Sequence, residues 1–392
     1  MITKRLLSTI SLLSIFLLST LLTGCSSSDD APVADTDAKR TLLVYIVAAN
    51  NLGQRGLDAA DIAEMKEGFK SLPDNGRGYR LLVYHAPYND DTRLFEILPD
   101  GTEKTLVTYD NSEYSVSVSR MRSVLSQTRT LAPAESYGLI LWSHGTGWIA
   151  NEYCLDEPNV ATQSFGSDRD KKQMKITSLA TALDGQHLDF IYFDCCLMGT
   201  VEIAYQLRHA TGKIVASGTE LPLQGMPYDK NIPCFFSATP NLKQAALNTY
   251  NFYADHNNDV EHSCTISVID TDALDALADA TRDIMSLGLL PSATFRPVPY
   301  FRTSVVETGA YDMGHYIHSL SVPQSLLSRW ESAYSAAITF TAATPFSYGL
   351  DMTEYTGLGC NIITSSSDPR LNYGYSSLQW YNDVVKYNTA IK

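Results

Sequence analysis

An imidazole and a thiol each follow an apolar run of this chain, and together they have the chemistry of a general base and a nucleophile. The run 137–143 leads into His144, and the run 188–193 leads, after one acidic residue, into Cys195 and Cys196. In such a pair the thiolate attacks the substrate while the histidine moves the proton. The first hypothesis from the sequence is therefore nucleophilic catalysis by a cysteine.

Both apolar runs have the pattern of strands that are buried on both faces, which is typical of a parallel sheet. Between them, the segment 176–183 has helical composition and an apolar stripe, so a β-α-β crossover can join the two strands. Strands joined in this way end at the same edge of the sheet, which is where open α/β sheets keep their sites. We therefore expect His144 and the two cysteines to meet at that edge.

The residues around the cysteines divide into two sides if the chain stays extended beyond the second run. Asp194 and Cys196 then project to one side and Cys195 to the other, so only one thiol shares a site with Asp194. A nearby carboxylate raises the pKa of a thiol, so Asp194 is a poor activator and is better placed to bind a positively charged substrate group. The backbone N–H of Gly145 and that of the cysteine are candidates for an oxyanion hole.

The composition is that of a globular protein and argues against a nucleic-acid partner. The 392 residues are 44% hydrophobic and 18% charged, with a formal net charge of −14. Such an acidic chain offers no basic face to nucleic acids or to anionic lipids. The length suits one large α/β domain with additions, or two domains.

From residue 41 onward, strand and helix patterns alternate, which predicts an α/β sheet protein. Beyond the two runs above, strands are predicted at 41–49, 80–86, 95–98, 103–107, 213–217 and 264–269, and helices at 56–69, 117–131, 198–208, 241–256 and 271–287. The alternation weakens after Pro291, where two helices, 311–320 and 323–337, and a late strand, 358–364, are expected. We interpret residues 291–392 as a C-terminal extension packed on the main sheet; a separate small domain is the alternative.

The N-terminus has the pattern of a processing segment rather than of a membrane span. Its hydrophobic stretch, 6–22, follows two basic residues and is short and diluted by Ser and Thr. It ends in Leu22-Thr23-Gly24-Cys25, which resembles the lipobox of bacterial lipoproteins. That resemblance implies removal of residues 1–24 and lipidation of Cys25. The residues after it are rich in Ser, Asp and Ala and lack large apolar side chains, which predicts a flexible tether over residues 25–40. A plain secretory signal is the alternative.

The predicted location is the envelope of a Gram-negative bacterium, at the outer membrane or the cell surface, with the lipid as the contact to the membrane. The acidic segment 28–30 resembles surface-export signals that follow the lipidated cysteine. The other cysteines follow no compact disulfide framework and include no C-x-x-C pair, so mostly free thiols and no structural zinc site are expected. We expect a monomer.

Three short motifs resemble those of the clostripain family of cysteine peptidases, which are relatives of caspases and gingipains. The motifs are Ser143-His144-Gly145, Asp194-Cys195-Cys196-Leu197-Met198 with Glu202 following, and Gly225-Met226-Pro227-Tyr228. The segments 45–52 and 61–65 fit the same pattern, so the resemblance extends over most of residues 41–230 and more faintly to the C-terminus. It implies a caspase-like, mainly parallel sheet flanked by helices, with a catalytic domain over residues 41–290.

The resemblance also implies roles for individual residues. His144 and Cys196 match the catalytic dyad of the family, which works through a thioester intermediate. Asp194 matches the acidic residue that helps to bind Arg or Lys at P1, and Glu220 resembles a second acidic pocket position. One departure is Cys195, since the middle residue of the family's Asp-x-Cys is usually small. It leaves open which cysteine attacks, and it could permit oxidative inactivation.

Family members commonly cleave themselves in a loop between the catalytic His and Cys. Here the polar segment 164–175 contains four basic residues that would suit a peptidase with basic P1 specificity, namely Arg169, Lys171, Lys172 and Lys175. An ordinary solvated loop is the alternative. Calcium dependence is known in the family, but no segment has EF-hand spacing, so we assign no metal ligand and no other cofactor.

Several other residues and function classes compete with this hypothesis. His85 also ends a strand and is a second candidate base, while His315 and His318 have a helical metal-binding spacing without a third ligand. A serine hydrolase is disfavoured because the chain lacks G-x-S-x-G. A non-catalytic cell-surface binding lipoprotein on a caspase-like scaffold is the main alternative, and ligation through the same thioester is not excluded.

Overall fold

The computed structural model describes residues 38–151, 162–258, 260–292, 310–372 and 374–391. All of them belong to one compact unit that runs from Asp37 to Lys392. None of the helices in these ranges is long and apolar enough to cross a membrane. Cys25 and the predicted tether 25–40, except its last three residues, lie outside the described residues, as does Cys154.

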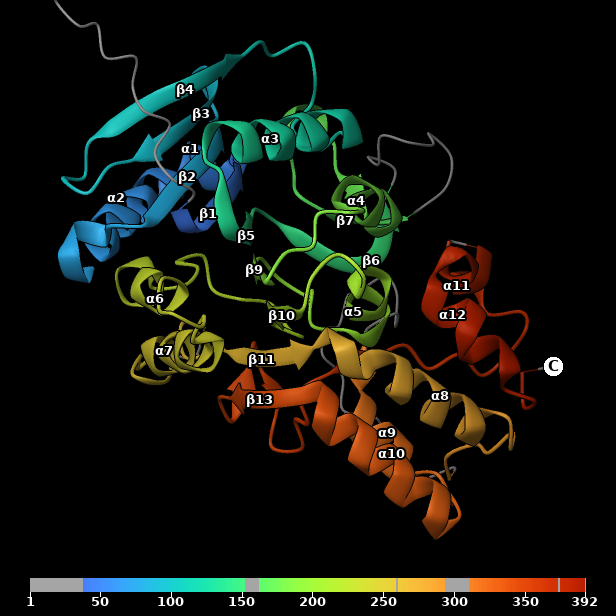
Figure 1. Ribbon diagram of the computed structural model, residues 1–392. Helices are drawn as coiled ribbons and strands as arrows, with labels where there is room; N and C mark the ends of the chain where they lie inside the picture. The colour runs from blue at the N-terminus through green and yellow to red at the C-terminus, as the bar shows by residue number, and fades with distance from the viewer. Residues whose placement is uncertain (1–37, 152–161, 259, 293–309, 373, 392) are drawn as a thin grey trace, which may run out of the picture. The chain divides into compact units, whose positions relative to one another are not determined.

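A nine-stranded mixed sheet forms the centre of this unit (Figure 1). In spatial order its strands are β13 (Ile338–Ala343), β11 (Thr265–Asp270), β10 (Lys213–Ala216), β9 (Phe190–Asp194), β5 (Ala134–Trp142), β1 (Ala38–Val47), β2 (Tyr79–Ala86), β3 (Thr92–Ile97) and β4 (Glu103–Tyr109). The five strands from β10 to β2 run parallel, while β11 and β13 at one side and β3 and β4 at the other are antiparallel. The predicted α/β fold with a mainly parallel sheet is therefore confirmed.

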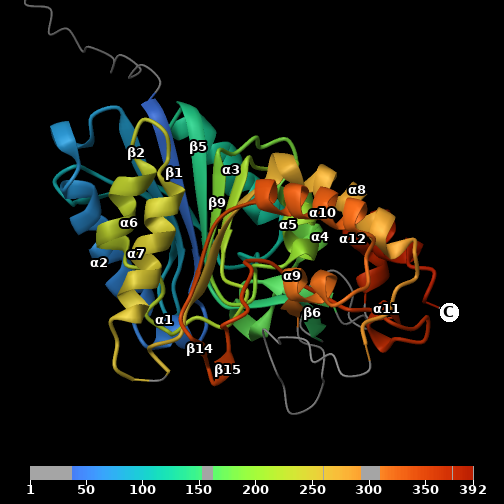
Figure 2. The ribbon, with the colours of Figure 1, turned by 90° about the horizontal axis from the view of Figure 1, so that it is seen from below.

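Helices cover both faces of the sheet, which explains why its central strands are apolar without alternation. One face carries α2 (Leu57–Lys70), α6 (Tyr228–Phe235) and α7 (Leu242–Ala254), and the other carries α3 (Val118–Leu131), α4 (Ile176–Leu183), α5 (Val201–Leu207), α8 (Leu274–Met285), α9 (Met313–His318), α10 (Gln324–Ala337) and α12 (Gln379–Asp383). Figure 2 shows the sheet between these two layers. In β1, residues 43, 45 and 47 pack in one core and residues 42, 44 and 46 in the other.

Several short elements surround the main sheet. Three small sheets pair β6 (Gly145–Asn151), β7 (Thr162–Phe165) and β8 (Met174–Lys175); β12 (Tyr311–Asp312) and β16 (Gly359–Cys360); and β14 (Phe346–Ser347) and β15 (Leu350–Asp351). The remaining α-helices are α1 (Asn51–Gln54) and α11 (Pro369–Asn372), and single 3₁₀ turns occur at Pro73–Gly76, Arg169–Lys171, Thr271–Ala273, Tyr375–Ser377 and Val385–Tyr387.

Two predicted elements have other bounds in the structure, and one strand of the main sheet was missed. The helix predicted from residue 198 begins at Val201, because Leu197 has a positive φ of 65° and turns the chain, and Gly199 N–H then bonds Ser217 O. The late strand predicted over 358–364 is limited to Gly359–Cys360, and it pairs with β12 rather than with the main sheet. The strand that does join the main sheet from the C-terminal part, β13, was not predicted.

Buried Glu202 ties α5 to the C-terminal part of the chain. Its Oε1 accepts hydrogen bonds from Asn361 N at 2.8 Å, Asn361 Nδ2 at 3.3 Å and Tyr375 Oη at 3.0 Å. The ring of Tyr375 also packs against Trp148 in β6, with 4.7 Å between the ring centroids. Glu202 lies eight positions after Asp194, in the helix that follows the segment 194–198. These contacts therefore link that helix to the C-terminal part of the chain.

We predict that Glu202→Ala lowers the free energy of unfolding by about 3 kcal/mol, because it leaves donors of Asn361 and Tyr375 buried without an acceptor. Urea denaturation measures this change. Tyr375→Phe removes only one of the three hydrogen bonds and should cost about 1 kcal/mol. A Glu202→Ala protein within about 0.5 kcal/mol of the wild type would contradict this account of the contact.

Candidate active site

The pairing of β5 with β9 places the imidazole and the thiol at the same level of the sheet edge. Trp142 and Asp194 are register partners in these parallel strands. His144 and Cys196 each lie two residues beyond this pair. Both line one pocket, together with Ser143, Asp194, Cys195 and a wall formed by Leu221, Pro222, Leu223 and Gly225, and its cavity volume is about 50 Å³.

The two adjacent cysteines face opposite cores, as the alternation predicted. Cys195 is only 4% exposed and packs in the core on the α5 side of the sheet, whereas half-buried Cys196 packs against the core on the α6 side. A side chain at Gly145 would collide with the backbone carbonyl of Cys196 and lie 3.2 Å from the sulfur of Cys195. Glycine is therefore required there, because the two strand ends approach so closely.

The Cys196 thiol is held in its protonated form at neutral pH. Burial raises its pKa to about 11, and the negative charges of Glu220 and Asp194 act in the same direction. The backbone N–H of Leu221 donates a hydrogen bond to the sulfur at 3.3 Å and partly offsets this shift. A base must therefore remove the proton before the sulfur can attack.

His144 has the properties of such a base. Burial lowers the pKa of its imidazole, so the ring is neutral at pH 7. Its Nε2 lies 2.7 Å from Oδ1 of Asn51 in α1. When Nε2–H donates to this oxygen, the lone pair is on Nδ1, which is then the atom that can accept a proton.

Asn51 thus completes a thiol, imidazole and amide arrangement that the residue-by-residue sequence reasoning missed. The available signal was its place in the 45–52 segment, to which no role was given. Its neighbour Asn50 fixes the position of α1, since Asn50 Oδ1 accepts from Leu52 N at 2.8 Å and Nδ2 donates to Val47 O at 2.9 Å.

Asp194 lies at the wall of the pocket and is only 5% exposed. Its Oδ2 accepts a hydrogen bond from Tyr228 Oη at 2.9 Å, which fixes the carboxylate from α6. Burial raises the pKa of Asp194, and it raises the pKa of Asp61, whose Oδ2 accepts from Trp142 Nε1 at 2.6 Å. The negative charges of the two carboxylates disfavour each other. Asp61 has the higher pKa of the two, so Asp61 holds a proton and Asp194 carries the negative charge.

The remaining candidate residues from the sequence do not line this pocket. Glu220 is half-buried, and its charge affects the Cys196 thiol, but it does not line the pocket. His85 is engaged elsewhere, with Nε2 2.7 Å from Asp58 Oδ2. His318 lies 3.1 Å from Glu331. In the part of the chain that the structure describes, no group of His, Cys, Asp or Glu side chains is arranged to hold a metal ion, so we derive no step through calcium.

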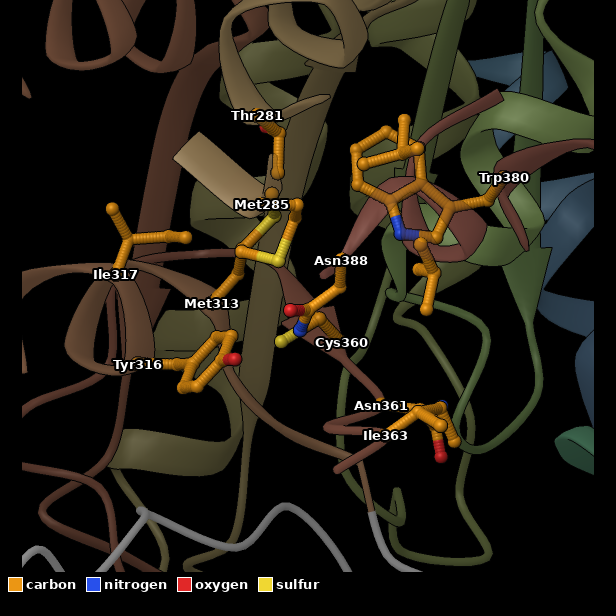
Figure 3. A pocket seen from close by; sticks show the side chains of 12 residues that line it. Thr281, Met285, Met313, Tyr316, Ile317, Cys360, Asn361, Ile363, Trp380 and Asn388 are labelled. Carbon is orange, nitrogen blue, oxygen red and sulfur yellow. The ribbon is translucent and has the colours of Figure 1, made fainter. Parts of the chain in front are cut away.

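A second pocket lies among the C-terminal elements and contains none of the predicted site residues. Figure 3 shows Met285, Met313 and Trp380 among the side chains around it. Its cavity volume of about 20 Å³ gives room for about one water molecule.

The segment 164–175 is attached to the residues around His144. Gly166 N–H donates to His144 O at 2.9 Å, and Asn50 Nδ2 donates to Ser167 O at 2.6 Å. Among its basic residues, Lys175 is buried and Arg169 donates to Glu113 O at 3.1 Å.

The accessibility of the four basic residues differs. Lys171 is exposed, Lys172 and Arg169 are partly exposed, and Lys175 is buried. Of the four predicted cleavage positions, Lys171 is therefore the most accessible.

Comparisons with known proteins agree with this geometry. The model of the clostripain family matches residues 44–295. Clostripain from Hathewaya histolytica is 30% identical over 225 residues, which are 49% of this chain and 41% of that protein. The match thus spans less than half the length of that curated relative.

Two solved structures are similar over most of this chain. A secreted C11 cysteine protease from Bacteroides thetaiotaomicron, in complex with an irreversible peptide inhibitor, is 28% identical, with a TM-score of 0.74 over 88% of this chain and 99% of that one. An inactive zymogen C11 protease from Parabacteroides distasonis is also 28% identical, with a TM-score of 0.75 over 90% of this chain and 99% of that one.

We predict that iodoacetamide alkylates Cys196 and spares Cys195 in the folded chain, because only Cys196 is partly exposed at the pocket. Since the pKa of Cys196 is raised, its thiolate fraction and the alkylation rate should rise about tenfold per pH unit between pH 7 and 9. Peptide mapping by mass spectrometry measures both results, and Cys196→Ala is the control. Labelling of Cys195, or a rate that is flat over this range, would contradict the description of the site.

Proposed function

The chain belongs to the clostripain family of cysteine peptidases, and on that basis we propose that it is an endopeptidase that cleaves after Arg or Lys through Cys196 and His144. The observation that carries this proposal is a single pocket lined by a thiol, an imidazole and a buried carboxylate. The thiol and imidazole supply the reaction, and the carboxylate supplies a preference for a basic side chain.

In the proposed acylation step, Nδ1 of His144 takes the proton of Cys196 as the sulfur attacks the scissile carbonyl carbon. Asn51 orients the imidazole through its contact with Nε2. The N–H groups of Gly145 and Cys196 are the proposed donors to the oxyanion. The imidazolium then protonates the leaving amine, and the acyl group remains on sulfur as a thioester.

In the deacylation step, water attacks the thioester carbon while His144 accepts a proton from it. The tetrahedral intermediate collapses, and the Cys196 sulfur leaves as a thiolate that takes the proton from His144. The product acid and the resting thiol are regenerated. No group outside the chain and the water molecule is needed for this cycle.

Asp194 is the proposed partner of the P1 side chain. The carboxylate is buried at the pocket wall and is held by Tyr228. A cation that enters the pocket would stabilise the charged form of Asp194 and lower its pKa back toward the ordinary range. An uncharged P1 residue would leave the desolvated carboxylate without a counterion. Glu220, beside the thiol rather than in the pocket wall, is proposed as a secondary contribution to the negative potential.

We also propose that the chain activates itself by cleavage after Lys171 or Lys172. The segment that contains them is bonded to His144 O and to Asn50, so its release would change the constraints on the catalytic histidine. The proposed setting of this activity is the cell envelope, with a lipid anchor at Cys25 and protein or peptide substrates.

The peptidase proposal predicts hydrolysis of matched fluorogenic peptides with Arg or Lys at P1, and none with Ala or Asp. We expect Cys196→Ala and His144→Ala to abolish hydrolysis, and Cys195→Ala to retain it. The chain is assayed under reducing conditions, before and after limited trypsin treatment with subsequent trypsin inhibition. No hydrolysis by any form would favour the non-catalytic binding protein.

If Asp194 binds the P1 side chain, the variant Asp194→Asn should lose the preference for a positively charged P1 residue. Breaking one buried ion pair costs about 3 kcal/mol, so kcat/KM for a P1 Lys peptide should fall roughly a hundredfold. A peptide with norleucine at P1 has nearly the same shape without the charge, and its slower hydrolysis should change little. If Lys and norleucine peptides lose activity equally, the carboxylate has another role.

Self-cleavage is tested by the double variant Lys171→Ala/Lys172→Ala, with Arg169→Ala as the matched control. On storage, the wild type and Arg169→Ala should yield two fragments, while the double variant and Cys196→Ala should stay intact. Gel electrophoresis with N-terminal sequencing identifies the new terminus. Fragmentation of the double variant at its wild-type rate would exclude these two positions.

A further inference from the structure

The hairpin β14–β15 belongs to the C-terminal part of the chain but lies at the edge of the sheet that carries the active site. Figure 2 shows it at the same end of the sheet as α1, which carries Asn51. Thr219 Oγ1 and Ser347 Oγ are 2.9 Å apart, and Tyr348 N donates to Ser263 Oγ at 3.0 Å. The hairpin is thus attached to the segment that runs from Thr219 to Leu221. The backbone N–H of Leu221 donates to the Cys196 sulfur.

Tyr348 sits at the tip of this hairpin in a backbone conformation that does not suit it. Its φ is 48° and that of Gly349 is 77°, so both central residues of the two-residue turn are left-handed. Such a turn favours Asn or Asp followed by Gly, because a bulky residue with positive φ is strained. Strain of this kind is typical of positions whose side chain serves a function rather than the fold.

The phenol of Tyr348 is within the electrostatic reach of Cys196 and Glu220. Burial raises its pKa to about 12, and the negative charges of Cys196 and Glu220 contribute to the shift. The side chain is nevertheless 37% exposed. One part of the ring therefore remains accessible from solvent.

Two other large apolar side chains are exposed, one in this hairpin and one in the pocket wall. Phe346, in the same hairpin, is 56% exposed, and Leu223, in the pocket wall after β10, is 45% exposed. Exposed apolar side chains at a pocket rim are typical of a binding surface. Leu223 and Thr219, to which the hairpin is bonded, follow β10, which pairs with β9 on one side. His144, the proposed proton donor to the leaving amine, follows β5 on the other side of β9. This arrangement assigns the exposed apolar side chains to the acyl part of the substrate.

We propose that Tyr348, with Phe346 and Leu223, forms an apolar subsite that binds the P2 side chain of the peptide substrate. The inference rests on the proposed peptidase activity and adds a second specificity to it. An aliphatic or aromatic P2 residue would cover the exposed part of the Tyr348 ring. The preferred substrate then has an apolar residue followed by Arg or Lys.

The test compares peptides that differ at one position and end in Lys with a fluorogenic leaving group. One pair has Leu or Ser at P2 with Ala at P3, and the second pair has Leu or Ser at P3 with Ala at P2. For the wild type, the Leu to Ser ratio of kcat/KM should be about ten or more at P2 and near one at P3. An equal ratio at both positions would overturn the assignment.

Tyr348→Asn is the informative variant because it creates the Asn-Gly turn that the backbone favours. Its thermal unfolding temperature should be equal to or above that of the wild type, so loss of folding does not confound the assay. The P2 ratio should collapse toward one, because kcat/KM falls more for the P2 Leu peptide than for the P2 Ser peptide. Tyr387→Asn, at another exposed tyrosine, is the matched control and should keep the wild-type ratio.

A Tyr348→Asn protein that keeps the full P2 ratio would overturn the inference while leaving the peptidase proposal intact. A variant that loses activity equally on both P2 peptides would also overturn it, since that result indicates a general role of the hairpin. No hydrolysis of any peptide by the wild type, even after trypsin treatment, would instead overturn the proposed function itself.

Discussion

The register between β5 and β9 is the constraint on which the site depends. Because Trp142 pairs with Asp194, the imidazole and the thiol two residues further on reach the same pocket. A shift of β9 by one residue would turn its side chains to the opposite faces and bring Cys195 to the face that Cys196 now occupies. The register is specified by two apolar cores, since every central strand buries alternate residues on opposite faces.

Burial sets the electrostatics of this site in a direction that opposes spontaneous reaction. It raises the pKa of Cys196 and lowers that of His144, so the thiol and the imidazole are both neutral at rest. It also raises the pKa of Asp194, which keeps its negative charge but is buried without a counterion among the described residues. A basic substrate side chain would reverse the effect at Asp194. The ring of His144 contacts Asn51, and the segment 164–175 is hydrogen-bonded to the backbone of His144 and to the side chain of Asn50. These bonds fit a resting site that needs rearrangement to become reactive.

The main sheet and the positions of His144 and Cys196 could be predicted from the sequence because they rest on local patterns. A continuous apolar run predicts a buried strand, and a crossover helix predicts that two such strands end together. Residues whose position depends on distant contacts could not be predicted. β13 has little pattern of its own and is defined by pairing with β11, and the hairpin that carries Tyr348 is held in place by bonds to Thr219 and Ser263. Asn51 lay in a recognised segment, but its contact with His144 is a fact of the fold.

The central claim is that one thiol, Cys196, acts beside a carboxylate that selects a positive charge. The most direct test is covalent labelling with a peptide chloromethyl ketone that has Lys at P1, compared with its norleucine analogue, followed by mapping of the adduct by mass spectrometry. The account predicts a single adduct on Cys196, formed much faster with the Lys reagent. An adduct on Cys195, or equal rates for the two reagents, would contradict it.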